Sequence, residues 1–252
     1  MLFSDILMTA ATASAGPALW TPLALGADLL GYWDAENTPT LTLSGSNVSS
    51  WADAVNGYVV SQALSSLKPI YSATSFNGRP GLAFDGADDY LTIASSPFPL
   101  GTHALEMWSL VSSTTIGSVV ATKIIASHAG SSAADALRLR RIGTGTTSQG
   151  GSSTGTSSTS INAMNTTTDF VGRHVLRGAF GLTQTKAYVD NDAAVTISAV
   201  PFENAGPFVI GATNTGTAVF PGIMNAVLVT LPLSDSQAAL LLSYLKTRGG
   251  IT

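Results

Sequence analysis

The sequence predicts an all-β sandwich that carries an N-terminal arm and one C-terminal helix. Short runs of apolar and β-branched residues alternate with clusters of Gly, Asn, Asp and Ser, which is typical of strands joined by turns. Apolar residues recur at helical spacing only near the C-terminus. The chain of 252 residues is 45% hydrophobic, which is enough to fill the core of one large domain.

Strands are expected wherever an apolar run lies between two turn signals. The run around residue 139 shows the pattern of a half-buried strand, because Leu137 and Leu139 share one face and Arg138 and Arg140 share the other. The expected strands are Gly31–Asp34, Val48–Trp51, Pro80–Phe84, Tyr90–Ile93, His103–Val111, Val119–Ser127, Ala136–Ile142, Phe170–Phe180, Lys186–Val189, Val195–Ser198, Phe208–Ile210 and Ile223–Leu231.

The segment Gly143–Ser160 consists almost entirely of Gly, Ser and Thr and carries no charge. It has too little apolar surface to pack into a core, and it is too long for a tight hairpin. We expect a loop or a polar sheet edge here. Strands on both sides of this segment are needed to complete one sandwich, so we expect a single domain over residues 23–252.

The expected helix begins after Ser234, which is a good N-cap and forms a capping box with Gln237. Lys246 and Arg248 suit the negative end of the helix dipole, and Gly249 offers a stop. Apolar residues recur between these signals at Ala238, Leu241, Leu242 and Leu245. This apolar stripe is expected to pack on the sandwich.

The N-terminal residues 1–22 are expected to form an arm that docks on a neighbouring protein, with a disordered terminus as the alternative. The stretch Met1–Gly16 is apolar and ends in small residues, but no Lys or Arg precedes the apolar part and Asp5 interrupts it. A secretory signal requires a basic start, so we do not expect one. The sequence contains no run of 18 apolar residues, so no membrane-spanning helix is expected.

The composition excludes several classes of function. Charged residues make up 10% of the chain, against roughly 25% in ordinary soluble domains. The net charge is −4 without a basic run, so we expect no nucleic-acid partner. Thiolate metal sites and Cys nucleophiles are excluded because the chain has no Cys. Sparse surface charge suits a homo-oligomer or a component present in many copies.

Several stretches resemble a known family. Phe76–Leu91 and Ala187–Asp190 resemble parts of the LamG-like, concanavalin A-like module, which implies a jelly-roll β-sandwich. The family usually has Gly after the Asp of the second stretch, whereas Asn191, which also tolerates a left-handed backbone, stands here. The closing strand of that module and its exit into a helix are resembled by Phe208–Gly211, Phe220–Ile223 and Leu233–Ser234.

A second resemblance bears on function. Leu19–Pro22, Tyr32–Ala35 and Val48–Asp53 resemble the start of LamG-like proteins found with tailed-phage structural proteins. This implies a virion surface protein, assembled in the host cytoplasm, that serves as a head decoration, spike or tail-fibre part. Its expected partners are other virion proteins, contacted through the arm, and host-cell polysaccharide. The alternatives are a secreted bacterial lectin, cleaved near Ala15, and a glycan hydrolase.

We expect no enzymatic activity from the residues alone. Glucanases of the concanavalin A-like fold carry a Glu-x-Asp-x-x-Glu strand, but Glu36, Glu106 and Glu203 are the only glutamates and none has this spacing. The stretch Gly151–Gly155 matches a nucleophile-elbow pattern, yet it lies in low-complexity sequence without the required strand and helix. A pair of aspartates elsewhere is left open.

Asp85, Asp88 and Asp89 form the candidate metal site. Three carboxylates within five residues suit a hard cation such as calcium, which takes oxygen ligands. The alternative, which we favour, is a turn at Asp85-Gly86 that leads into the next strand without a metal. We therefore expect no cofactor, with calcium as the open alternative.

The candidate ligand-binding residues are Arg138, Arg140, Arg173 and Arg177. Each pair shares one face of its own strand. If the two strands are neighbours, one sheet face carries a basic patch that would bind acidic polysaccharide or an acidic capsid surface. The alternative is an ordinary solvated face.

Four tryptophans could stack on sugar rings. Each lies in an apolar strand or near a Pro turn, so for at least three of the four we favour a place in the core or against the arm. They are Trp20, Trp33, Trp51 and Trp108.

Overall fold

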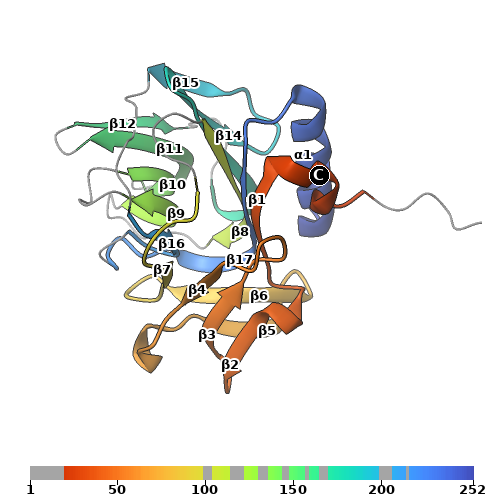
Figure 1. The fold of residues 1–252 in the computed structure, drawn as a ribbon, viewed down its shortest axis with the longest axis vertical. Coiled ribbons are helices and arrows are strands. Elements are labelled where there is room, and N and C mark those ends of the chain that lie inside the picture. Colours follow the sequence, from red (N-terminus) through yellow and green to blue (C-terminus); the bar gives the residue numbers. More distant parts are fainter. Residues whose placement is uncertain are drawn as a thin grey trace, which may run out of the picture.

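The computed structural model describes residues 20–98, 104–113, 122–129, 136–143, 148–156, 159–164, 170–198, 206–213 and 216–252. The described residues form antiparallel strands, three short 3-10 helices and one C-terminal α-helix (Figure 1). The strands are β1 Leu29–Asp34, β2 Leu41–Ser44, β3 Asn47–Ala52, β4 Val59–Ser61, β5 Ile70–Phe76, β6 Arg79–Asp85, β7 Leu91–Ile93, β8 Leu105–Ser113, β9 Thr122–Ala129, β10 Ala136–Gly143, β11 Ser148–Thr156, β12 Thr159–Met164, β13 Gly172–Phe180, β14 Gln184–Val189, β15 Val195–Ser198, β16 Phe208–Ile210 and β17 Pro221–Thr230. The helices are η1 Pro22–Asp28, η2 Thr38–Thr40, η3 Ser65–Leu67 and α1 Asp235–Gly249.

The strands form two layers. In the first layer the hydrogen-bonded order is β1–β17–β8–β13–β14–β15, and the start of β17 pairs with β6 instead of β1. In the second layer the order is β7–β16–β9–β10–β11–β12. The α-helix lies on the outer side of the first layer, away from β9–β12 (Figure 1). The two layers of antiparallel strands and the α-helix confirm the prediction of an all-β sandwich with a C-terminal helix.

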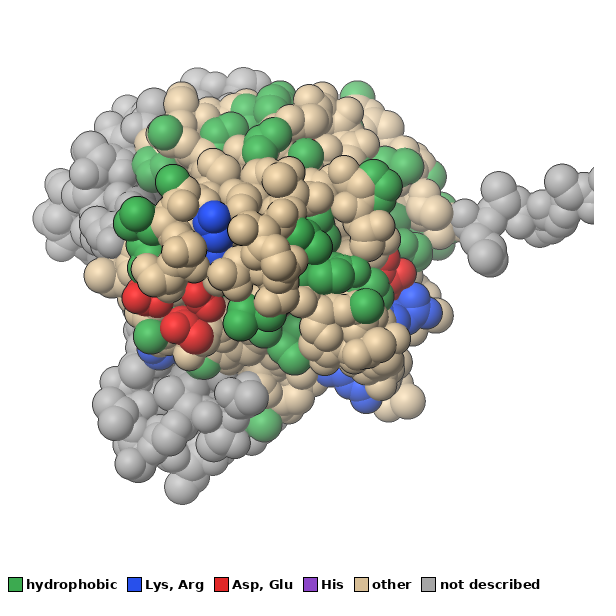
Figure 2. Space-filling model, turned by 90° about the horizontal axis from the view of Figure 1, so that it is seen from below, with side chains coloured by type: hydrophobic (Ala, Val, Ile, Leu, Met, Phe, Trp, Pro, Cys, Tyr) green, Lys and Arg blue, Asp and Glu red, His purple; other side chains and the backbone are tan. Residues whose placement is uncertain are grey.

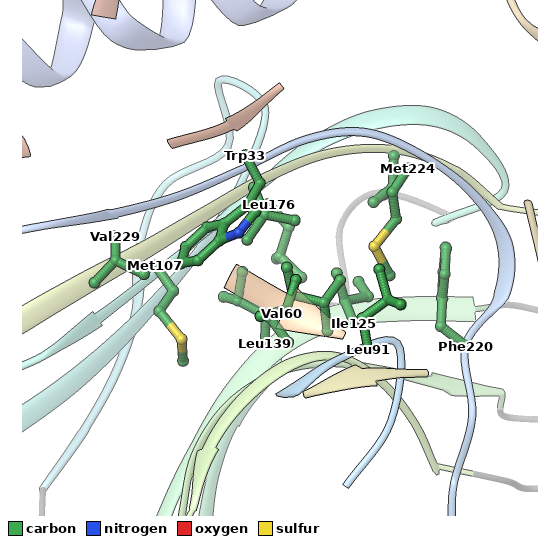
Figure 3. Close-up of a cluster of buried hydrophobic side chains, with 14 of the residues drawn as sticks. Trp33, Val60, Leu91, Met107, Ile125, Leu139, Leu176, Phe220, Met224 and Val229 are labelled. Atoms are coloured by element: carbon green, nitrogen blue, oxygen red, sulfur yellow. The ribbon is translucent and has the colours of Figure 1, made fainter. Parts of the chain in front are cut away.

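The main core lies between the two layers. Trp33 stacks on Phe208 with ring centroids 5.0 Å apart, and aliphatic side chains from both layers meet around them (Figure 3). Leu139 of β10 packs onto Gly178 of β13, where an added Cβ would lie 2.8 Å from the leucine Cδ2 atom. The layers are therefore in direct contact at this point, and glycine is required there. Trp33, Trp51 and Trp108 are buried, as predicted.

A second core lies between the first layer and α1. Trp108, Leu110 and Val175 on the sheet pack with Leu241 and Leu245 on the helix. The helix begins as predicted, with the Ser234 hydroxyl and the Gln237 side chain forming a capping box. It ends one residue later than predicted, because Gly250 and not Gly249 adopts the left-handed conformation, with φ of 60°.

An ion-pair cluster fastens the helix to β1. The guanidinium of Arg248 is buried and contacts the carboxylates of Asp34 and Glu36 and the hydroxyl of Tyr32. Burial alone would lower the pKa of Arg248, but the hydrogen bonds and negative charges of these partners raise it above its usual value. Arg248, which was predicted to interact with the helix dipole, thus forms buried ion pairs that hold the helix against the segment of Asp34 and Glu36.

The segment predicted as a loop or a polar edge contains two strands. Within Gly143–Ser160, β11 pairs with β10 on one side and with β12 on the other. β11, which makes up most of the segment, is thus a strand inside the layer, and among the described residues the edge strand is β12, most of which follows Ser160. Strands β2, β4 and β5 were not predicted. They form a small antiparallel region with β3.

The face seen in Figure 2 is mostly uncharged, with charged side chains gathered in a few small groups. This agrees with the sparse charge of the composition. None of the helices in the described ranges is long and apolar enough to cross a membrane. The predicted arm, residues 1–22, lies outside the described residues up to residue 19.

Candidate functional site

The four arginines predicted to bind a ligand lie on strands that are not neighbours. Arg173 and Arg177 belong to β13, which pairs with β8 and β14, whereas Arg138 and Arg140 belong to β10, which pairs with β9 and β11. The side chains of Arg138 and Arg140 lie outside the described residues. The condition for one basic patch, that the two strands are neighbours, is therefore not met, because the strands lie in different layers. Ligand binding by either pair alone stays a prediction.

Both arginines of β13 are held by the protein itself. Arg173 donates from Nη1 to the carbonyl oxygen of Gly249 at 2.8 Å. Arg177 makes a two-pronged ion pair with Glu106, with Nε to Oε2 at 3.1 Å and Nη2 to Oε1 at 2.6 Å. One hydrogen-bonding edge of the Arg177 guanidinium is therefore occupied before any ligand arrives.

Arg177 is also stacked between two aromatic rings. It stands directly opposite Trp108 on β8 and Tyr188 on β14 in the sheet register. Its guanidinium carbon lies 4.7 Å from the centroid of Trp108 and 4.5 Å from that of Tyr188. Both distances fit cation–π contacts, which fix the planes of the rings. Glu106, Trp108, Arg177 and Tyr188 are called the Arg177 stack below.

Glu106 is the almost fully buried member of the Arg177 stack. Burial raises the pKa of its carboxyl, although Arg177 and the Trp108 indole, which donates from Nε1 at 3.1 Å, oppose this rise. A carboxylate in such a place is costly unless its hydrogen bonds are made, and three of them are. The pair of Glu106 and Arg177 therefore supports the rings above it.

A groove runs between α1 and the strands of the stack. It consists of two adjoining cavities of about 270 and 330 Å³, which share Arg177, Tyr188 and Asp235. The first turn of α1 forms one wall, and β14 with the turn that follows it forms the other. We call this feature the helix–sheet groove. Its polar lining at the end of β14 consists of Asp190, Asn191 and Asp192.

The turn after β14 is held firmly in place. The Asp190 carboxylate accepts a hydrogen bond from the amide of Val175 at 2.8 Å and meets Nδ1 of His174 at 2.7 Å. Asp190 itself adopts a positive φ of 49°. From the sequence we expected the left-handed backbone conformation at Asn191, so the expected position is off by one residue. Because Asp190 is engaged, Asn191 and Asp192 are presented to the groove on a fixed backbone.

The groove combines groups that recognise small polar ligands. An aromatic ring, an amide and several carboxylates face one cavity of suitable size. Sequence reasoning identified Arg177 but missed Glu106, Tyr188 and Asp235. The motif that contains Tyr188 was noted only as a sign of fold, and its neighbours in the groove come from distant segments of the chain.

The predicted metal residues do gather, with ligand oxygens of Asp85, Asp88 and Asp89 within 4.8 Å of one another. Asp85 accepts hydrogen bonds from the amides of Ala87, Asp88 and Asp89, and Asp89 accepts one from the amide of Asp85. These bonds are those of the turn that the sequence favoured. Calcium binding at the three carboxylates stays a prediction.

The two aspartates of this turn have opposite pKa shifts. Burial tends to raise the pKa of Asp85, but the three amides outweigh it and the pKa lies below its usual value. Burial, together with the charges of Asp85 and Asp88, raises the pKa of Asp89 to about 6. The surroundings of the turn therefore stabilise the charged form of Asp85 and destabilise the charged form of Asp89.

Comparison with known proteins identifies the fold but not the family. No protein-family model matches the chain, and no curated protein matches it. An arabinofuranosidase solved with arabinofuranosyl-alpha-1,2-xylobiose matches at 11% identity and a TM-score of 0.59, over 79% of this chain and 50% of its own. A Trypanosoma rangeli sialidase matches at 13% identity and a TM-score of 0.57, over 92% of this chain and 34% of its own.

These comparisons correct the expectation that the protein has no enzymatic activity. That expectation depended on the absence of one glucanase motif, whereas the similar structures are named as arabinofuranosidases and sialidases, which are glycoside hydrolases. At this level of identity the likeness establishes the fold alone, and this chain spans only half or a third of the length of those enzymes. The shared fold is one found in proteins that act on glycans.

Proposed function

We propose that this chain is a glycan-recognition domain and that its ligand lies in the helix–sheet groove. The observation that carries the proposal is the Arg177 stack, in which Tyr188 is fixed by a cation–π contact and borders a cavity lined by Asn191 and Asp192. Sugars are bound by an aromatic surface for their C–H groups and by amide or carboxylate groups for their hydroxyls. The glycan-related names of the similar structures support this choice.

The test is the affinity of Tyr188 variants for a panel of immobilised oligosaccharides. Tyr188→Ala removes the ring and should weaken binding roughly tenfold, which corresponds to about 1.4 kcal/mol. Tyr188→Phe keeps the stack and should retain most of the affinity. The matched control is Tyr244→Ala, because Tyr244 borders a separate cavity with Trp20 on the other flank of α1. Equal affinity of all four proteins for every glycan would contradict the proposal.

A second candidate function is glycoside hydrolysis in the same groove. It is favoured by the enzymes among the similar structures and by the carboxylates of Asp192 and Asp235, since glycosidases act through two carboxyl groups. Release of reducing sugar from arabinose- or xylose-containing polysaccharide, abolished by Asp192→Asn or by Asp235→Asn, would support it. Turnover that survives both substitutions would contradict this assignment.

From the sequence resemblance we further propose a concanavalin A-like jelly roll at the surface of a phage virion. The arm 1–22 would attach it to other virion proteins, in many copies, and residues 23–252 would meet host-cell polysaccharide. The support is the resemblance of Leu19–Pro22 and Tyr32–Ala35 to such proteins. Co-purification with particles that depends on residues 1–22 tests it, whereas equal recovery of the truncated chain on the particles would contradict it.

A further inference from the structure

We infer that the helix–sheet groove selects neutral or amine-bearing glycans and repels glycans that carry carboxylates. The inference rests on the proposed function, since it names the ligand class of the same groove. It also replaces the acidic polysaccharide that the arginine pattern suggested. The reason lies in how the charges of the groove are placed.

The cavity at the end of β14 is lined by more negative than positive groups. Asp190, Asp192 and Asp235 line it together with one cation, Arg177. Three carboxylates and one guanidinium leave a formal charge of −2, and Glu106, which binds Arg177 from below, brings it to −3. Protonated His174 beside Asp190 would offset one of these charges at most.

The cation of the groove is poorly placed to receive an anionic sugar. The Arg177 side chain is 16% exposed, and its Nε and Nη2 atoms are bonded to Glu106. Its two faces are covered by Trp108 and Tyr188. Arginine recognises a carboxylate through two parallel N–H groups, and the Nε/Nη2 edge, one of the two that can present such a pair, already binds Glu106.

The start of α1 does not supply the missing positive charge. A helix N-terminus attracts anions through its free amides. Here the Ser234 hydroxyl accepts from the amide of Gln237, and the exposed carboxylate of Asp235 occupies the first turn. The positive end of the helix dipole therefore stabilises a side chain of the protein itself.

The far end of the groove is balanced, which gives the ligand a direction. The second cavity is lined by Arg177 and Lys186 against Glu106 and Asp235, so its formal charge is zero. The negative potential is concentrated near the turn after β14. An ammonium group of a glucosamine unit would lie at that end, and a neutral unit would lie against Gln184 and Thr183 at the other.

The experiment measures binding of the whole chain to three oligosaccharides of equal length. The three are a glucosamine oligomer, an N-acetylglucosamine oligomer and a galacturonic acid oligomer. The affinity for each is measured by calorimetry at 50 and 300 mM salt. We expect the glucosamine oligomer to bind most tightly, to weaken with salt, and to exceed the galacturonate at least tenfold in affinity. Galacturonate binding equal to or tighter than glucosamine binding would overturn the inference.

Variants separate the groove from general electrostatics. The double variant Asp192→Asn/Asp235→Asn should lower glucosamine affinity roughly fivefold more than it lowers N-acetylglucosamine affinity, because only the ammonium group loses an attraction between charges. The matched control Asp88→Asn removes an exposed carboxylate elsewhere and should change neither. An equal loss in the control and the double variant would overturn the inference while the proposed function stands. If the chain binds none of these three oligosaccharides and none of the immobilised oligosaccharides used to test Tyr188, both the inference and the proposed function would be overturned.

Discussion

At the residue scale, Asp85 and Asp89 illustrate how neighbours of one type can have opposite roles. The carboxylate of Asp85 accepts hydrogen bonds from three backbone amides, which stabilise its charged form. Asp89 is buried and accepts a hydrogen bond from one backbone amide, that of Asp85. A hydrogen bond to a charged acceptor stabilises the folded state by about 1.5–3 kcal/mol. The turn is thus built mainly by Asp85, while Asp89 is the group that limits its stability at neutral pH.

The raised pKa of Asp89 predicts a particular dependence of stability on pH. The pKa is about 6 in the folded chain against 3.8 for the free side chain, so the folded state binds the proton more tightly. This contribution is complete below pH 3.8 and is lost as the pH rises to about 6. Asp89→Asn should therefore raise the free energy of unfolding above pH 6 by about 1–3 kcal/mol relative to wild type.

Urea unfolding at pH 4 and pH 7.5 provides the measurement. The advantage of Asp89→Asn should be present at pH 7.5 and small at pH 4, and Asp88→Asn, which removes one of the charges that raise the Asp89 pKa, should show a smaller advantage at pH 7.5. If Asp89→Asn is no more stable than wild type at pH 7.5, the charge of Asp89 is not strained as described.

The calcium hypothesis belongs to the same three residues and has its own measurement. If calcium binds Asp85, Asp88 and Asp89, a chelator should lower the melting temperature of the chain, and Asp88→Asn should remove that effect. The effect should weaken below pH 6, because Asp89 becomes protonated. A melting curve that does not move with chelator would eliminate calcium.

At the scale of elements, α1 shows which features of a helix the sequence predicts. Its caps and apolar stripe are local signals, and Ser234, Gln237 and Leu241 have the roles expected of them. Arg248 was assigned to the helix dipole, a local effect, but its actual partners Asp34 and Glu36 lie more than 200 positions away in the sequence. No periodicity within a helix reveals such a contact.

Arg248 predicts a large effect on stability. Arg248→Met would leave Asp34 and Glu36 half-buried without their cation, which costs about 3–5 kcal/mol when a buried pair is broken on one side. Denaturant unfolding measures this cost, with Lys246→Met, two positions before Arg248, as the control. Adding Asp34→Asn to Arg248→Met should recover part of the loss. A cost similar to that of the control would show that the cluster contributes little.

The strands show the same division between local and distant information. Val195–Ser198 and Phe208–Ile210 were predicted with the bounds they have, because apolar runs and turn residues mark them. Strands β11 and β12 lack apolar runs, and only the pairing of β11 with β10 and of β12 with β11 accounts for them. Their Gly, Ser and Thr residues form backbone hydrogen bonds at an edge where little apolar burial is required.

At the scale of the whole molecule, the arrangement of strands in two layers decided which predictions held. Alternation within β10 and β13 correctly separated inward from outward positions, as Leu139 and Leu176 in the core demonstrate. Sequence patterns do not indicate which strands become neighbours, so the arginines of the two strands were joined in one patch that the layers separate. The helix–sheet groove was missed for the same reason, because Glu106, Arg177, Tyr188 and Asp235 come from four separate elements.

The contact between the two layers predicts how the molecule responds to a single added methyl group. A Cβ at Gly178 would lie 2.8 Å from Leu139 Cδ2 and 2.8 Å from the Phe180 ring, so Gly178→Ala should destabilise the sandwich by about 1–3 kcal/mol. Leu139→Val removes one of the two clashing atoms, so the double variant should lose less than the sum of the single losses. Ala179→Ser, on the outer face of the same strand, is the control. Strictly additive losses in urea unfolding would mean that the layers adjust independently, and a coupling of at least about 0.5 kcal/mol would establish their direct contact in solution.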